Sequence, residues 1–338
     1  MRLRRADTSR PGYTRRRRGK GFGYLDETGA PLTDPAELDR VAALVIPPAW
    51  RDVWICRDPR GHIQATGTDA AGRRQYRYHD QWRVKRDAAK FDHVLEVARH
   101  LPELREQVAA DLARRGYGRD RVLAAAARLL DIGVFRIGGE AYASQDDPSG
   151  AATYGLATLL REHVSVRGAR MDFQYPAKGN IERTQRIVDR DTATVLKALL
   201  KRDSDDPELL AYREGRRWHD VRSDDVNAYL KEHSHGCEIS AKDFRTWHAT
   251  VLAAVALAGA PAPSQTGRRK AVVAAMKQVS QYLGNTPTVA RASYVDPRVI
   301  DLYNSGTVLE LPPADGDPLA AHGARSQAEK ALLELLGD

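Results

Sequence analysis

The hydrophobic pattern changes its period once along this chain, and that change limits the folds open to it. From Val53 to His79, β-forming residues alternate with turn residues such as Pro59 and Gly61, which predicts a small antiparallel sheet. Beyond Gln81, apolar residues recur at three- and four-residue steps, which predicts long helices. The sequence therefore predicts an α+β fold, in which a β-rich N-terminal domain precedes a larger, mainly α-helical domain.

The length of 338 residues exceeds what one hydrophobic core usually organises, so two domains are expected. We expect a flexible basic arm over residues 1–20, a β-rich domain over 21–82, a mainly helical domain over 83–310, and a tail with an amphipathic helix over 311–338. Turn residues from His163 to about Ile187 interrupt the helical pattern. They predict a short β-hairpin or three short strands within the helical domain.

Helix start and stop signals place several polar residues of the second domain. The run Ser240–Asp243 has the spacing of a capping box, which places Arg245 early in a helix. Gly284 is suited to end the following helix, because glycine adopts the left-handed conformation there readily. Pro287 then begins a short helix, which Tyr294 follows.

The positive charge is concentrated at the N-terminus. The formal net charge is +8, and residues 1–20 hold nine basic residues and one acidic residue, so the remainder of the chain is neutral. A basic segment attracts polyanions, and each neutralised phosphate adds about 0.9 to the salt dependence of binding. The run Arg15–Arg18 fits a solvated tail, a contact with DNA or a nuclear import signal, and these interpretations stay open.

Other features exclude several classes of protein. No stretch approaches the roughly 20 apolar residues that span a bilayer, and the arginine-rich start is unlike a secretory signal. The two cysteines, Cys56 and Cys237, lie too far apart for a CxxC pair, and a reducing cytoplasm is expected. No GxxxxGK[ST] loop occurs, so ATP use is not expected.

Two sets of residues in the sequence are of the types that bind metal ions. His233, His235 and Cys237 alternate, but a fourth ligand at a recognised spacing is missing. Acidic pairs suggest a metal-dependent nuclease, yet each pair stands beside a Pro, a Ser or a helix start, where carboxylates serve as caps; the pairs are Asp146-Asp147, Asp205-Asp206 and Asp224-Asp225. We therefore expect no metal site and no cofactor.

Five short segments stand in an order that is hard to obtain by chance. They are Phe135-Arg136-Ile137-Gly138, Tyr175-Pro176-Ala177-Lys178-Gly179, Lys242-Asp243-Phe244-Arg245, Leu283-Gly284-Asn285-Thr286-Pro287, and Ser293-Tyr294. Taken in order, these segments resemble the type IB DNA topoisomerases of bacteria and poxviruses. The resemblance extends from about Gly72 to Asn304.

The resemblance implies a role for five residues. Tyr294 is implied as the nucleophile, Arg136 and Arg245 as transition-state arginines, Lys178 as the general acid, and Asn285 as a donor to a phosphate oxygen. Many relatives are expected to have histidine at the position of Asn285. Taken singly, each residue also fits a structural role, such as a surface ion pair or a half-buried core tyrosine.

The same residue types make chemical sense without the resemblance. A tyrosyl oxygen that displaces a sugar hydroxyl from a phosphodiester passes through a phosphorus centre whose nonbridging oxygens carry negative charge. Guanidinium groups present planar, permanently charged donors to two such oxygens. The departing 5′ oxygen needs a proton, which a lysine can donate, whereas an asparagine amide can only orient or stabilise.

The run Gly72–His79 resembles the N-terminal DNA-contacting strand of the same enzymes. Residues expected to bind DNA there are Arg73, Arg74, Gln75, Tyr76 and Tyr78. On a strand, Tyr76 and Tyr78 share one face while Gln75 lies on the other. Glutamine can read adenine and tyrosine can contact phosphate, although an ordinary sheet surface with paired aromatic residues is the alternative.

The predicted function is that of a type IB topoisomerase, which acts on duplex DNA through a 3′-phosphotyrosyl intermediate without ATP or metal. We expect a monomer in the bacterial cytoplasm, associated with the nucleoid, with no membrane and no small-molecule cofactor. A tyrosine recombinase is the nearest alternative, but such enzymes typically place histidine where this chain has Lys242. A non-catalytic DNA-binding protein would explain the charge but not the ordered residues.

Overall fold

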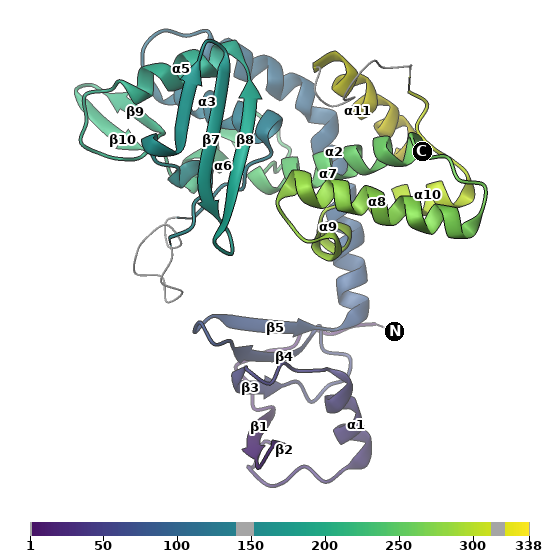
Figure 1. The fold of residues 1–338 in the computed structure, drawn as a ribbon. Helices are drawn as coiled ribbons and strands as arrows, with labels where there is room; N and C mark the ends of the chain where they lie inside the picture. Colours follow the sequence, from purple (N-terminus) through teal and green to yellow (C-terminus); the bar gives the residue numbers. More distant parts are fainter. Residues whose placement is uncertain (1, 140–151, 312–321, 338) are drawn as a thin grey trace. The chain divides into compact units, whose positions relative to one another are not determined.

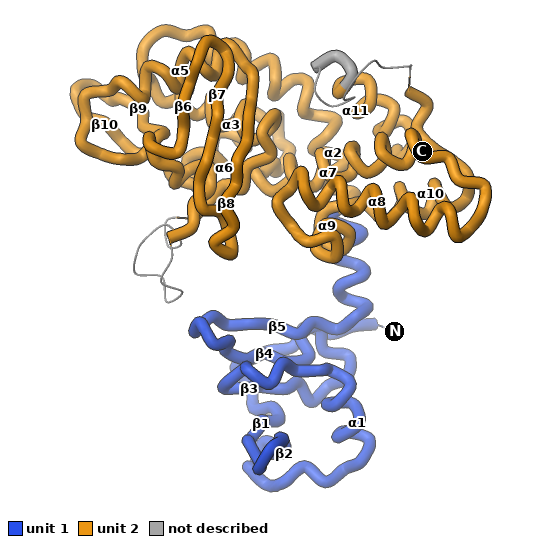
Figure 2. The backbone as a smooth tube through the Cα atoms, viewed as in Figure 1, with its two compact units in different colours: residues 1–90 blue, residues 91–338 orange. Residues whose placement is uncertain are grey.

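A computed structural model describes residues 2–139, 152–311 and 322–337 of the chain (Figure 1). The chain divides into two compact units, Met1–Lys90 and Phe91–Asp338, which are coloured separately in Figure 2. The division lies within helix α2 (Asp80–Leu112), eight residues beyond the expected boundary at residue 82. The acidic pair Asp146-Asp147 lies outside the described residues, as does the part of the expected tail over 312–321.

The first unit contains the antiparallel sheet predicted from Val53 to His79, and two further strands near the N-terminus, which were not predicted, extend it. Its five strands stand in the order β2-β1-β3-β4-β5, and helix α1 (Pro35–Ala43) lies between β2 and β3 in the chain. A small core of five buried residues fills the unit: Val41, Ile46, Val53, Ile55 and Ala65. The strands are β1 (Tyr13–Arg18), β2 (Gly21–Leu25), β3 (Arg51–Ile55), β4 (Ile63–Thr68) and β5 (Arg74–Tyr78).

The expectation of a flexible arm over residues 1–20 is corrected for Tyr13–Arg18, which form β1. This strand pairs with β2 along its length and with β3 at Tyr13 and Thr14. The side chain of Arg15 also has structural partners, because its guanidinium donates hydrogen bonds of 2.6 to 3.1 Å to three backbone carbonyls and lies 4.2 Å from the ring centroid of Phe22. Backbone pairing and these carbonyls order the segment, which its charge alone did not indicate.

The second unit is mainly helical, as predicted, and two small sheets lie at one side of it (Figure 1). The expected interruption forms three antiparallel strands, β6 (Val164–Arg167), β7 (Arg170–Ala177) and β8 (Ile181–Val188). A second hairpin, β9 (Ala211–Glu214) with β10 (Arg217–Asp220), was not predicted, because strands of four residues leave almost no alternating pattern. The remaining helices are α3 (Arg119–Gly133), α5 (Arg190–Leu200), α6 (Ser223–Glu232), α7 (Ala241–Ala258), α8 (Gln265–Leu283), α9 (Pro287–Ser293), α10 (Pro297–Ser305) and α11 (His322–Leu336).

The predicted helix ends are confirmed where they matter for function. Asp243 accepts a hydrogen bond from the backbone N–H of Ser240 at 2.9 Å, which begins α7. Gly284 follows α8 with φ 63°, in the left-handed region. Thr286 then caps α9, with Pro287 in its first turn, and Tyr294 ends that helix.

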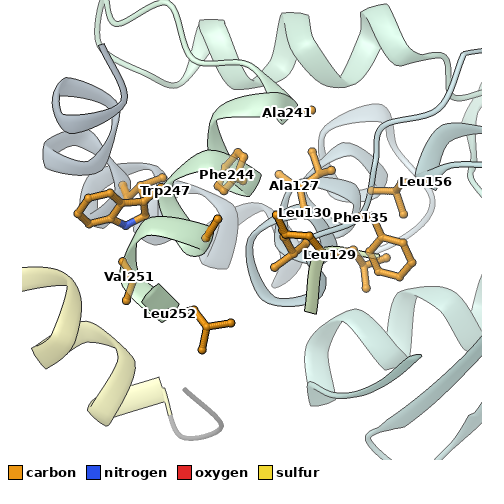
Figure 3. Packing of buried hydrophobic residues seen from close by; sticks show 14 of the residues in the cluster. Ala127, Leu129, Leu130, Phe135, Leu156, Ala241, Phe244, Trp247, Val251 and Leu252 are labelled. Carbon is orange, nitrogen blue, oxygen red and sulfur yellow. The ribbon is translucent and has the colours of Figure 1, made fainter. Parts of the chain in front are cut away.

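Helices α3 and α7 carry the centre of the core of the second unit. Leu129 and Leu130 of α3 lie among buried side chains that include Phe244, Trp247 and Val251 of α7 (Figure 3). Nearly every residue of α7 is buried, including the unbroken run from Asp243 to Val255, so the helix is enclosed on all its faces. This packing fixes α7, which carries Arg245, and α3, which Arg136 follows.

A buried cluster of ionisable residues attaches the C-terminal helix α11 to this core. Asp131 of α3 accepts hydrogen bonds from Arg105 of α2 at 2.8 and 2.9 Å and from Arg325 of α11 at 3.2 Å. Glu329 of α11 accepts from Arg105 at 2.6 Å. His248 of α7 lies between them, with Nε2 3.1 Å from Asp131 and Nδ1 2.7 Å from the Arg325 guanidinium. Two cations and two anions balance here, so the imidazole belongs to the cluster as a neutral ring.

Acidification should weaken the fold through His248. Burial, together with the nearby Arg325, lowers the pKa of His248 from 6.5 to about 4. A proton therefore binds the unfolded chain more strongly than the folded one, and stability is lost as the pH falls from about 6.5 towards 4. Urea unfolding of the full chain across this range should show a smaller loss for His248→Gln than for the wild type. Equal slopes in the two proteins would contradict this account.

Candidate functional site

Arg136 and Arg245 come together at the ends of α3 and α8. Arg136 follows α3, where Val134 adopts a left-handed conformation with φ 53° and turns the chain out of the helix. Arg245 lies in the second turn of α7 and is only 3% exposed. Its guanidinium donates hydrogen bonds to the carbonyls of Val134 and, at 2.8 Å, of Leu283. One buried arginine thus joins the last residues of two helices.

Asn285 is the partner of Arg136. The Arg136 guanidinium donates a hydrogen bond to the Asn285 side-chain oxygen and contacts the Gly284 carbonyl at 3.4 Å. Because this bond uses the amide oxygen, the amide nitrogen remains as a donor. That nitrogen is buried and has no hydrogen-bond partner among the residues that the structure describes. Asn285 is therefore arranged to donate a hydrogen bond to an acceptor that enters the site.

Tyr294 stands beside the two arginines. The guanidinium carbon of Arg245 is 5.4 Å from the centroid of the Tyr294 ring. Burial raises the pKa of the Tyr294 phenol, but the positive charges of Arg245 and Arg136 outweigh burial and bring the pKa below its ordinary value of 10. Burial and the charge of Arg136 in turn lower the pKa of Arg245 to about 10. This environment therefore stabilises the phenolate of Tyr294 relative to that of a tyrosine in water.

Lys178 lies at the tip of the hairpin between β7 and β8. Gly179 and Asn180 make the turn with φ of 80° and 55°, so both occupy the left-handed region. The last pair of the hairpin is Ala177 with Ile181, and Lys178 itself is exposed. The tip carries the lysine to the rim of the cavity described next.

A cavity of about 250 Å³ brings these residues together. Three of the five predicted residues line it, namely Arg136, Lys178 and Arg245, while Asn285 and Tyr294 contact the arginines beside it. A concave site lined by four cationic side chains, the fourth being that of Arg183, with Tyr294 beside it, suits a phosphate group. The other residues that line the cavity are Tyr154, Tyr175, Ala177, Ile181, Glu182, Arg183, Thr184, Gln281, Leu283 and Gly284.

Four of the residues expected to bind DNA lie on β5 of the first unit, at one edge of the sheet, and Arg73 directly precedes this strand. Tyr76 and Tyr78 share a face as predicted, with ring centroids 6.0 Å apart and 21° between the ring planes. Tyr76 is 44% exposed. The amide of Gln75 and the guanidinium of Arg73 both donate to Asp69, at 2.9 and 3.0 Å. Arg74 is exposed and approaches the Thr66 hydroxyl at 3.4 Å.

Arg183 is the residue of the site that the sequence did not single out. It lines the cavity from β8, and its guanidinium donates a 2.7 Å hydrogen bond to the Tyr282 carbonyl at the end of α8. The signal lay in the strand pattern, because Arg183 shares a face with the buried Ile187. A charged residue at an inward position of a strand indicates a specific partner.

Comparison with known proteins gives the family of the chain. Residues 79–304 match the family model of the catalytic core of eukaryotic DNA topoisomerase I, and residues 21–69 match that of the N-terminal domain of bacterial DNA topoisomerase IB. The chain is also 27% identical over 317 residues to the DNA topoisomerase 1B of Acanthamoeba polyphaga mimivirus, which covers 91% of this chain and 92% of the relative.

These matches establish the class of the protein as an isomerase that acts on DNA, a DNA topoisomerase. More narrowly, the chain belongs to the type IB topoisomerase family and carries the N-terminal domain of the bacterial members. In the part of the chain that the structure describes, no helix has the length and apolar character needed to cross a membrane.

Removing the charge of Arg245 should raise the pKa of Tyr294. In Arg245→Met the phenol keeps its burial but loses the larger of the two opposing charges. The difference in near-ultraviolet absorbance between this variant and its Tyr294→Phe derivative, followed with pH, gives the titration of this one phenol. The midpoint should lie higher than in the same comparison made in the wild-type background. Arg186→Met, which changes an exposed arginine on β8, is the control, and a midpoint unmoved by Arg245→Met would contradict the assignment.

Proposed function

We propose that this topoisomerase relaxes supercoiled DNA by cutting one strand, holding it through Tyr294 and rejoining it. The observation that carries the proposal is a pair of buried donors beside one tyrosine. The Nε of Arg245 and the Nδ2 of Asn285 are both buried and lack hydrogen-bond partners among the described residues. An unsatisfied buried donor costs about 1–3 kcal/mol. A phosphate oxygen that enters the cavity would remove this cost at both positions.

The chemistry follows from the position of each group. The Tyr294 oxygen attacks the scissile phosphorus, its proton goes to solvent, and the bond from phosphorus to the 5′ oxygen breaks. Arg136, Arg245 and Asn285 donate to the nonbridging oxygens, where negative charge grows in the transition state. Lys178 supplies a proton to the departing 5′ oxygen. The products are a 3′-phosphotyrosyl ester and a free 5′ hydroxyl.

The ester conserves the energy of the phosphodiester bond, so the reverse attack by the 5′ hydroxyl reseals the strand without ATP. Fixed guanidinium groups provide the charge stabilisation that a metal provides in other phosphoryl transfers, so we infer that the reaction is also independent of metal. Between cleavage and resealing, the free end rotates and torsional strain is released. We infer that the enzyme acts as a monomer on duplex DNA of the bacterial nucleoid.

The first unit supplies DNA contacts in this proposal. The exposed Arg16, Arg17 and Arg18 of β1 attract phosphates without regard to sequence. On β5, the exposed Tyr76 and its stacked neighbour Tyr78 offer two hydroxyl groups to the backbone. A tyrosine recombinase is the alternative, and the match of residues 21–69 to a topoisomerase domain favours the relaxing enzyme.

Relaxation of supercoiled plasmid tests the proposal directly. The wild type should relax the plasmid with EDTA present and ATP absent, whereas Tyr294→Phe should leave it supercoiled because no nucleophile remains. Denaturation during the reaction should trap wild-type protein on the 3′ end of the cut strand. Tyr303→Phe, a buried tyrosine on α10, is the matched control and should keep the activity. A wild type that leaves the plasmid supercoiled at every salt concentration would refute the proposal.

The amide of Asn285 should contribute to the rate of cleavage. Loss of one preorganised donor to a developing oxyanion slows an enzyme by about 10² to 10³-fold. Asn285→Ala should therefore slow single-turnover cleavage to this degree, and Asn285→Asp should slow it further because the carboxylate adds negative charge beside the phosphate. Rapid mixing with a labelled duplex gives both rates. Cleavage by Asn285→Asp as fast as by the wild type would remove Asn285 from the reaction.

A further inference from the structure

Arg183 occupies an unusual position on β8. The inward side chains of β7 and β8 pair across the sheet as Met171 with Ile187, Phe173 with Gln185, and Tyr175 with Arg183. The β7 members of these pairs are all buried and apolar or aromatic. On β8 the inward face changes from apolar to polar towards the hairpin tip. A polar residue retained on an inward face indicates a specific hydrogen-bond partner.

The two polar residues of this face each bind the end of a helix. Gln185 donates a hydrogen bond to the Gly133 carbonyl at the end of α3. Arg183 donates to the Tyr282 carbonyl at the end of α8 at 2.7 Å. These are the helices that lead into Arg136 and Asn285 respectively. Strand β8 therefore fixes the hairpin against both segments that carry phosphate-binding residues.

Gly284 leaves the space that Arg183 needs. A Cβ at residue 284 would overlap the Nη1 atom of the Arg183 guanidinium, and the residue also has a left-handed φ of 63°. In the observed arrangement, the Arg183 guanidinium occupies the space that a side chain at residue 284 would fill. Burial lowers the pKa of Arg183, as does the charge of Arg136. Removing the charge of Arg183 from water costs free energy, which its hydrogen bond to the end of α8 must offset.

We propose that Arg183 is a positioning residue, which sets the Lys178 hairpin tip against the end of α8. The inference rests on the proposed function, because it assigns Lys178 as the proton donor to the 5′ oxygen. Lys178 lies in a turn of three exposed residues beyond the last strand pair. Arg183, two residues past that pair, makes the nearest bond from the hairpin to α8. Without that bond the tip loses its fixed distance to Asn285 and to the phosphate.

This role predicts a specific kinetic defect. Misplacing a catalytic group by about 1 Å can slow a reaction roughly 10²-fold, and loss of a general acid costs about 10² to 10⁴-fold. Arg183→Met should therefore slow single-turnover cleavage roughly 10²-fold while the dissociation constant for DNA stays near that of the wild type. The methionine keeps the length and apolar stem of the side chain and removes the donors.

A change of leaving group tests the proposal. In a duplex built around a site that the wild type cleaves, the bridging 5′ oxygen is replaced by sulfur. A thiol has a pKa of about 8.5, so its thiolate departs without a proton donor. Arg183→Met and Lys178→Ala should both regain nearly the wild-type rate on the sulfur substrate. Arg136→Ala should remain slow on both substrates, since the nonbridging oxygens are unchanged. Arg186→Met, on the solvent face of the same strand, should behave as the wild type.

Each other outcome overturns the inference. If Arg183→Met stays slow on the sulfur substrate, Arg183 contacts the phosphate itself or supports the whole fold. If it cleaves the oxygen substrate at the wild-type rate, Arg183 has no part in the reaction. Should Arg183→Met fail to fold, Arg183→Lys keeps a buried cation, and it should show a smaller defect with the same restoration by sulfur. A defect of Arg183→Lys that sulfur leaves unchanged would equally refute positioning.

The experiment separates this inference from the proposed function. If Lys178→Ala is not restored by sulfur, the proton donor is another group, and the positioning role of Arg183 fails with it. Plasmid relaxation by the wild type and its loss in Tyr294→Phe would still stand. If the wild type does not cleave at all, the proposed function itself fails.

Discussion

The C-terminal end of α8 is the point on which the site depends. Three guanidinium groups, from a strand, a helix and the segment after α3, meet three successive carbonyls there. Arg183 of β8 binds the carbonyl of Tyr282 at 2.7 Å, Arg245 of α7 binds that of Leu283 at 2.8 Å, and Arg136 contacts that of Gly284 at 3.4 Å. The last carbonyls of a helix have no partners within the helix and carry partial negative charge. Here arginines supply both the donors and the opposite charge.

This arrangement explains how like charges are held close together. Three guanidinium groups around one cavity repel each other, and burial adds the loss of hydration. The ends of α3 and α8 offset part of that cost, because the Val134 carbonyl also accepts a bond from Arg245. The remaining excess of positive charge acts on Tyr294, whose pKa falls below its ordinary value although burial raises it. The same groups that order the backbone therefore favour the phenolate.

The sequence predicted the helical and β-rich parts because their patterns are local. The capping run at Ser240, the glycine that ends α8 and the proline that begins α9 each act within one turn of helix, so they were found without tertiary information. Three features were beyond such reasoning. The hairpin of β1 and β2 joins the rest of the sheet through β3, which lies more than thirty residues from β1. Strands of four residues leave no periodic signal. The partner of Arg183 is a backbone carbonyl 99 residues away, which no side-chain pattern reveals.

The buried cluster around Asp131 and His248 also uses arginine hydrogen bonds to hold helices in place, here within the core. Asp131 lies on α3 five residues before Arg136, and His248 lies on α7 three residues after Arg245. Through Arg325, helix α11 therefore holds the two helices that present both arginines. Hydrogen bonds between charged groups have narrow geometry, unlike apolar contacts, which tolerate sliding. Because the end of α3 and the start of α7 are fixed in this way, in the proposed reaction the arginines would need little rearrangement to receive a phosphate, since their donors are already in place.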